Sequence, residues 1–244
     1  MSHKFMIIVL AVFTASTLIA QLSPSDQAVI DAYRAAIRSA ENGGREIEAA
    51  FSKLISLTQT LTRSRGAQGA VLEAISAEEF EHLRRDLPGV LINREEVVFV
   101  KPDPNYFANL ARTRGDAADR AFFSTLKATY PEAVWPVYVE QQTDYSGCTR
   151  FGSGTLVDTY RAWSEFQRRF PTRYVAVAKE ELDEVIAQLT ESTCACGNTS
   201  SIQDELQRFL KTFQTTSPVR TKVNERLQAL RGGRSSIRTN CKSG

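Results

Sequence analysis

Glu140 and Asp144 are the residues whose types and spacing come closest to catalytic chemistry. They lie four residues apart in the segment 130–154, which is rich in tyrosine and tryptophan. Glycoside hydrolases use two carboxyl groups: one protonates the glycosidic oxygen, and the other acts as base or nucleophile. Aromatic rings beside such a pair can pack against sugar faces. The two acids therefore indicate, as one candidate function, a carboxylate-dependent hydrolase that acts on glycan.

The same segment also predicts a binding surface. It is the longest irregular stretch of the chain, and long loops held on a helical scaffold often carry function. Its candidate binding residues are Trp135, Tyr138, Tyr145 and Arg150. In the alternative interpretation, the loop acids pair with Arg150 while Trp135 and Tyr138 complete the core.

The sequence lacks the motifs of several other classes of enzyme and cofactor-binding protein. The sequence contains no G-x-S-x-G, Walker A, G-x-G-x-x-G or H-E-x-x-H pattern, so it predicts no cofactor. Gly152-Ser153-Gly154 is interpreted as a turn that caps the next helix. His82 is interpreted as a surface residue, because nothing beside it completes a nucleophile–base pair.

The four cysteines predict two disulfide bonds and no metal site. Cys194 and Cys196 are separated by one residue, which is neither a C-x-x-C spacing nor a loop that a disulfide closes easily. Each is therefore expected to pair elsewhere, one with Cys148 and one with Cys241. Which of the two pairs with Cys148 and which with Cys241 remains open. A bond to Cys241 would tether the polar, basic tail of residues 232–244.

Residues 1–20 have the form of a secretory signal peptide. A basic residue, Lys4, precedes an apolar run that begins at Phe5, and Ala20 is a suitable last residue before cleavage. The apolar run is shorter than the roughly 20 residues that span a bilayer. An exported protein is predicted, periplasmic or extracellular, with no transmembrane span in the mature chain.

The charge balance argues against nucleic acid as a partner. Lys and Arg total 30 against 28 Asp and Glu, whereas nucleic-acid binders show a clear basic excess. The stretch 218–244 is locally basic and could make a weak contact with an anionic surface. Its basic residues are Arg220, Lys222, Arg226, Arg231, Arg234, Arg238 and Lys242.

Apolar residues recur with helical spacing through most of the mature chain. Adjacent glycines at 43 and 44 predict a break between the first two helices, since two glycines cost about 2 kcal/mol inside a helix. Strands are expected at 97–100, 137–139 and 174–177. The sequence predicts a mainly α fold: one helix-dominated domain over 21–231, with at most two or three short strands and two disulfides.

The preferred function is binding of an envelope component or a protein partner by an exported, disulfide-stabilised helical protein. The alternatives are the glycan hydrolase and a structural envelope protein without a site. A binding protein should present an exposed aromatic patch. An enzyme should present a cleft with two carboxyl groups about 5–10 Å apart.

Overall fold

The computed structural model describes residues 22–43, 46–66, 69–95, 97–131, 134–143 and 146–241. The predicted leader lies outside this range, so the leader and its cleavage stay predictions. Helices dominate the described part, which confirms the mainly α fold class. Its strands form two separate antiparallel pairs, one strand more than the sequence pattern suggests. Within the described residues, no helix is long and apolar enough to cross a membrane.

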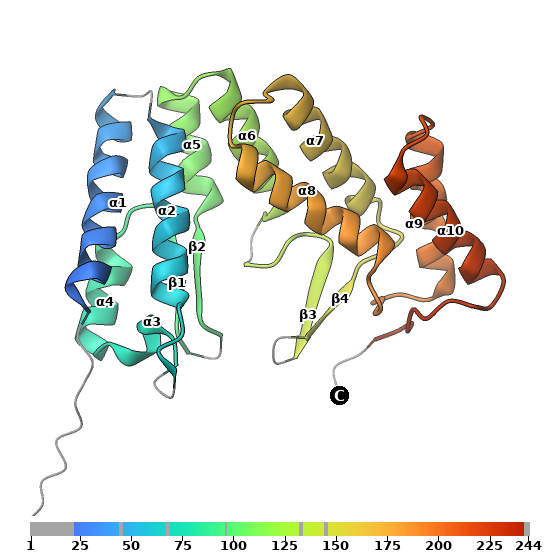
Figure 1. Ribbon diagram of the computed structural model, residues 1–244, viewed down its shortest axis with the longest axis horizontal. Coiled ribbons are helices and arrows are strands. Elements are labelled where there is room, and N and C mark those ends of the chain that lie inside the picture. Colours follow the sequence, from blue (N-terminus) through green and yellow to red (C-terminus); the bar gives the residue numbers. More distant parts are fainter. Residues whose placement is uncertain are drawn as a thin grey trace, which may run out of the picture.

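The first half packs α1 against α2, with the β1–β2 hairpin and α5 beside them (Figure 1). The predicted break between the first two helices is confirmed, since α1 ends at Gly43. The Ser76 side chain accepts a hydrogen bond from the Glu79 amide and so caps α4, as the S-x-x-E pattern predicts. The elements are α1 (Pro24–Gly43), α2 (Ile47–Thr62), α3 (Val71–Ala74), α4 (Ala77–Asp86), β1 (Val90–Asn93), β2 (Phe99–Pro102), α5 (Pro104–Arg114) and α6 (Ala117–Thr129).

The second half begins with a hairpin and continues as two helical pairs. The predicted strand at 174–177 is wrong: α8 begins at Val175, and Tyr174 has a left-handed conformation at φ 51°, which no strand can accommodate. Only Val139 of the strand expected at 137–139 belongs to β3. The elements are β3 (Val139–Thr143), β4 (Ser146–Thr149), α7 (Thr155–Arg169), α8 (Val175–Thr190), α9 (Thr199–Thr212) and α10 (Pro218–Arg231).

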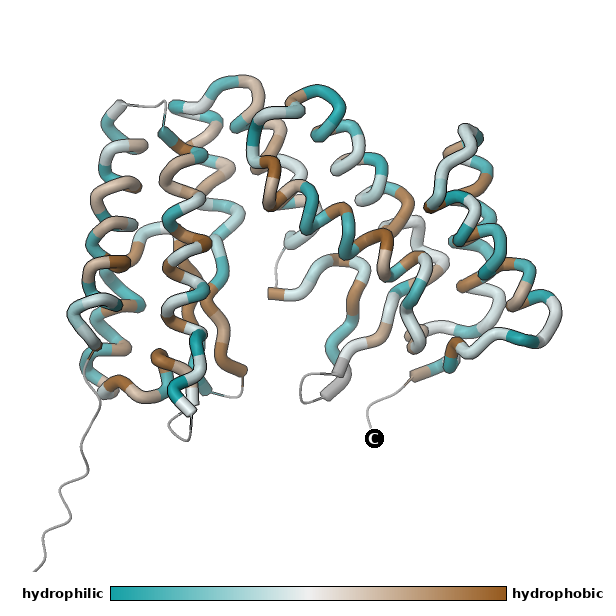
Figure 2. Tube along the Cα trace, in the orientation of Figure 1, coloured by the Kyte–Doolittle hydropathy of each residue, from teal (hydrophilic) through white to brown (hydrophobic). Residues whose placement is uncertain are grey.

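Two clusters of buried apolar residues form the core, and helices α7 and α8 contribute to both. In α8, Ala178 belongs to the first cluster and Val185 to the second. Figure 2 shows how hydrophobic and hydrophilic residues alternate around these helices. Because two continuous helices join the clusters, the surfaces on either side of the junction are held by regular structure. The single-domain organisation stays a prediction.

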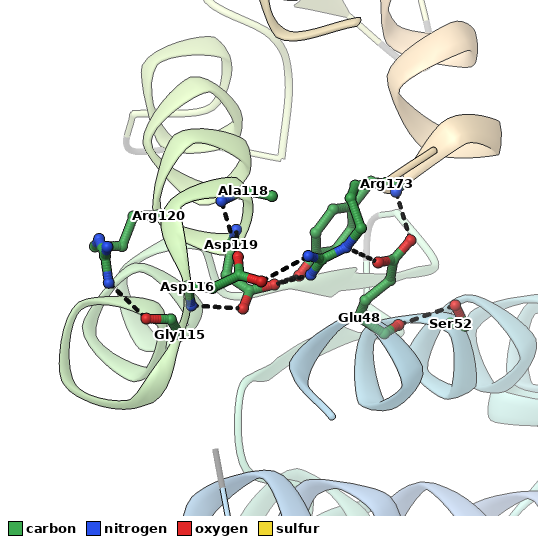
Figure 3. Close-up of polar contacts among 9 residues, drawn as sticks. Glu48, Ser52, Gly115, Asp116, Ala118, Asp119, Arg120 and Arg173 are labelled. Atoms are coloured by element: carbon green, nitrogen blue, oxygen red, sulfur yellow. Dashed lines mark hydrogen bonds and ion pairs between the residues drawn. The ribbon is translucent and has the colours of Figure 1, made fainter. Parts of the chain in front are cut away.

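Arg173 fastens the α7–α8 connection to the first half (Figure 3). Its guanidinium group pairs with Glu48 of α2, with Asp116 at 2.7 Å and with Asp119 of α6 at 2.7 Å. The neighbouring Tyr174 donates its hydroxyl to Asp119 at 2.6 Å. These bonds stabilise the strained left-handed backbone at Tyr174, which costs on the order of 1–3 kcal/mol.

Both disulfides match the predicted scheme. Cys148 of β4 is bonded to Cys196, and Cys194 is bonded to Cys241. The tail is also held by its backbone, because the Cys241 amide donates to the Ala195 carbonyl at 2.9 Å. Residues 232–241 are therefore attached to the second half, as expected for a tethered tail.

Candidate functional site

A cleft of about 810 Å³ lies at the junction of the two halves. One wall comes from α2 and the β1–β2 hairpin, and the facing wall comes from α8, β4 and the segment that leads into β3. Clefts that bind small molecules usually measure about 300–1,000 Å³. This hollow is therefore large enough for a small ligand, and the helices that join the two cores form it in advance.

The two walls differ in character. Ile55, Leu91, Val100 and Pro102 give the first wall an apolar surface, and Leu91 remains 41% exposed. The facing wall carries the acidic side of α8. Among the described residues that line the cleft, Lys101 of β2 is the single basic one. The acidic lining residues are Glu180, Glu181, Glu184 and Glu191.

Glu181 is the acid of this wall that is held closest to the core. It lies between Ala178 and Val185, the α8 residues that enter the two cores, so the helical repeat turns its carboxyl group inward. The Tyr130 hydroxyl donates to both carboxylate oxygens at 3.2 Å. Desolvation raises the pKa of Glu181 to about 7, although the Tyr130 hydrogen bond and the Lys101 charge oppose the shift.

Two buried hydroxyl groups near these acids have no hydrogen-bond partner in the described part of the chain. They belong to Thr58, on the α2 wall of the cleft, and to Tyr138. Tyr138 is fully buried, and desolvation together with the charges of Glu181 and Glu184 raises its pKa. A buried hydroxyl without a hydrogen-bond partner destabilises a fold, because most buried polar groups in proteins have such a partner.

One end of the cleft is a chain of polar side chains. Gln188 donates to Glu184 at 2.9 Å and accepts from the Thr149 hydroxyl at 2.5 Å, and Thr149 lies 2.5 Å from the Ser192 hydroxyl. Behind this end, Arg226 donates to the backbone carbonyls of Gln188 and Ser192. Burial lowers the pKa of Arg226 to about 10. The polar end is thus fixed by hydrogen bonds from both sides.

Trp135 also lines the cleft and is half-buried there. Its indole nitrogen donates to the Gln141 side chain at 2.6 Å, which fixes the ring at the entrance to β3. Among the expected binding residues, Trp135 therefore lies at the cleft, whereas Tyr138 lies in the core behind it. For Tyr138, this matches the alternative interpretation of the aromatic segment.

The remaining candidates lie elsewhere. Glu140 is exposed and pairs with Arg150 at 3.3 Å, and neither residue lines the cleft. Asp144 and Tyr145 lie outside the described residues. Among the described candidates, the structure brings Trp135 to the same cleft as the acids of α8, and it brings Glu140 and Arg150 together away from it.

Glu140 also lies near the sulfurs of Cys148 and Cys196, a grouping whose spacing would suit a metal ion. The two sulfurs are bonded to each other. Metal coordination by cysteine requires the free thiolate, so this group cannot act as a ligand set while the disulfide is intact.

The glycine turn at residues 152–154 is a structural cap. Both glycines have positive φ, and their amides donate to the Glu205 carboxylate at 2.9 and 2.7 Å. The Val157 amide donates to the same side chain at 3.2 Å. An internal carboxylate therefore occupies the anion-binding position at the start of α7, as the interpretation of this turn as a cap predicts.

Two basic residues of the C-terminal stretch also have structural roles. Arg220 donates to the carbonyls of Leu210 and Phe213 at the end of α9, and Arg226 occupies the equivalent place at the end of α8. Lys222 pairs with Glu191 at 3.5 Å. Contact of this stretch with an anionic surface stays a prediction.

Sequence reasoning missed Glu181, Tyr130 and Lys101. The available signal was the position of Glu181, three residues after Ala178 and four before Val185 on the inward side of α8. Glutamate on an apolar stripe is a candidate functional residue, because burial of an ionisable group is unfavourable unless it serves a purpose.

Comparisons with protein families, with curated proteins and with solved structures find no match to this chain.

Proposed function

We propose that the chain is an exported binding protein whose cleft takes an organic cation with an apolar body. The observation that carries this proposal is Glu181, a carboxylate held in a poorly solvated cleft whose lining is acidic on one wall and apolar on the other. The signal-peptide pattern and the two disulfides support export, since disulfides persist in oxidising compartments.

A positively charged ligand would complement each part of the cleft. Its charge would compensate Glu181, whose pKa is raised by desolvation and, to a smaller extent, by the charges of Glu180 and Glu184. The faces of Trp135 and Tyr130 can attract a cation, at about 0.5–2 kcal/mol per contact. Its apolar part would pack on the wall formed by Ile55 and Val100.

The size of the cleft favours a small envelope component over the flat surface of a protein partner. A hollow of about 810 Å³ encloses a drug-sized molecule or one long side chain, whereas a stable protein interface buries roughly 800 Å² on each partner.

A second candidate is the glycan hydrolase, with α8 now supplying the carboxyl groups. A pKa of about 7 suits a general acid at neutral pH, and Glu184 lies one helical turn from Glu181. This proposal predicts that the protein releases reducing ends from a purified cell-wall glycan, and that Glu181→Gln does not.

Binding can be tested with three probes of equal length: n-octylammonium, n-octanol and n-octanoate. The chain has two tryptophans, and Trp163 is fully buried, so cleft binding should change the fluorescence of Trp135. At pH 8.5 the expected order of affinity is ammonium, then alcohol, then carboxylate. Glu181→Gln should markedly reduce the preference for ammonium over alcohol and retain binding of the alcohol. Equal affinity for all three, or no binding, would contradict the proposal, and no binding would favour a structural protein without a site.

A further inference from the structure

Lys101 extends from β2 toward the Tyr130–Glu181 pair. Its ammonium nitrogen lies 5.6 Å from the centre of the Tyr130 ring, within the range of a cation–π contact. The positive charge of Lys101 also lowers the pKa of Glu181. A primary ammonium group on an alkyl chain thus already lies over the aromatic face that the proposed ligand would use, and its charge acts on the carboxylate there.

We propose that the Lys101 ammonium covers, in the free protein, the face of Tyr130 that the ammonium group of the ligand covers when it contacts Glu181, so that Lys101 is a tethered competitor. This inference rests on the proposed function and makes it more specific. It identifies the ligand as a primary alkylammonium compound, because that is the group which Lys101 itself presents.

The contacts of Lys101 would allow a ligand to displace its ammonium group from the cleft. Among the described residues, no carboxylate lies within ion-pair distance of its nitrogen, so nothing holds the charge in one place. The backbone of Lys101 is fixed by pairing with Leu91 in the β1–β2 hairpin. Its four-carbon stem is flexible, so the ammonium group can leave the cleft while the strand stays in place.

Two sources can supply the same chemistry: a free linear amine, or the lysine side chain of a peptide. The apolar wall and the acids Glu180 and Glu184 are compatible with either the free amine or the lysine side chain. Cadaverine and the peptide acetyl-Ala-Lys-Ala-amide present these sources separately and can be titrated in parallel with n-octylammonium.

The experiment compares four proteins by calorimetry at pH 8.5: wild type, Lys101→Met, Lys101→Arg and Lys53→Met. Lys53 is exposed on α2 and does not line the cleft. Removal of the competitor should tighten binding of n-octylammonium about three- to tenfold in Lys101→Met, which corresponds to loss of one cation–π contact. Lys101→Arg and Lys53→Met should bind within about twofold of wild type.

Two controls separate competition from other effects. The gain for n-octylammonium in Lys101→Met must exceed the gain for n-octanol, since methionine could simply make the cleft more apolar. The pKa of Glu181, followed by NMR of its carboxyl carbon, should rise in Lys101→Met and stay unchanged in Lys53→Met.

Equal or weaker ammonium binding by Lys101→Met would overturn the competitor proposal and leave the proposed function standing. If neither wild type nor Lys101→Met binds any of the amines, the proposed function itself fails. Tightening for cadaverine or for the lysine peptide would support the proposal and identify the source.

Discussion

The Tyr130 hydroxyl donates to both carboxylate oxygens of Glu181, 3.2 Å from each, inside the cleft between the two halves of the molecule. This pair joins the end of α6 to the middle of α8, where the two apolar cores meet. Burial keeps the pKa of Glu181 near 7 even though its tyrosine partner favours the ionised form. The carboxylate is therefore a destabilising feature that a ligand can compensate.

Glu181→Gln should stabilise the protein at alkaline pH. The folded-state pKa of Glu181, about 7, lies above the ordinary value of 4.5. The stability associated with the protonated group is therefore fully present below pH 4.5 and is lost as the pH rises through 7. At pH 8.5 the variant should be roughly 2–3 kcal/mol more stable than wild type in urea denaturation, and at pH 4.5 nearly equal to it. The exposed Glu180→Gln is the matched control. An equal difference at both pH values would contradict the assignment.

Tyr138→Phe should leave the stability unchanged or raise it. The Tyr138 ring is fully buried in the second core, and its hydroxyl has no partner within the described residues. Removing an unpaired buried hydroxyl relieves about 1–3 kcal/mol of desolvation. Tyr138→Ala should instead cost roughly 3–5 kcal/mol, because it leaves a cavity. A destabilised Tyr138→Phe variant in thermal unfolding would show that the hydroxyl makes a bond.

Arg173→Met should destabilise the protein by about 3 kcal/mol, since it leaves the buried Asp119 without its counter-ion. The part of the effect that comes from Asp116 should diminish in acid. Burial alone would raise the pKa of Asp116, yet the hydrogen bond from Arg173 lowers it overall. The stability that Asp116 contributes is thus present above its unfolded pKa and lost as the pH falls through the lowered value. Denaturant midpoints at pH 7 and pH 3 test this, with Arg161→Met, an exposed pair with Asp158, as the control. An undiminished effect at pH 3 would refute the charge-based explanation.

Cys241→Ser should release the tail and lower the free energy of unfolding by about 2–4 kcal/mol. Residues 238–241 still pair with the backbone of residues 193–197, so the released tail should detach by fraying. Limited proteolysis should remove it faster from the variant than from wild type, while Cys148 and Cys196 stay linked in non-reducing peptide maps. Equal rates of tail loss would show that the disulfide does not restrain it.

Local signals predicted many features of the fold correctly. The end of α1 at Gly43, the capping serine at 76 and the glycine turn before α7 behave as their residue types require. That Cys194 and Cys196 each pair elsewhere followed from the single residue between them, whereas the sequence leaves the choice of partner for each open and the structure gives it. Apart from that choice, these features depend on a few neighbouring residues, so the sequence alone determines them.

The strands and the site depend on distant contacts. Tyr174 adopts a left-handed conformation only because Glu48 and Asp119 bind it, and both residues lie far away in the sequence. The cleft arises where α8 faces β2, so no segment by itself places Lys101 beside Tyr130. Of the residues predicted from the aromatic segment, Trp135 lines the cleft, whereas the carboxyl group of the proposed site lies on a helix whose pattern looked ordinary.

A ligand ammonium that contacts Glu181, as proposed, must displace the proton of this carboxyl group, so proton release on binding is the decisive measurement. At pH 7 about half of the Glu181 side chains carry a proton that a cation would expel. Calorimetric titration with n-octylammonium in two buffers of different ionisation enthalpy should therefore show release of about half a proton per ligand at pH 7. At pH 9, and at either pH in Glu181→Gln, it should show almost none. Binding without proton release from the wild-type protein at pH 7 would contradict the claim.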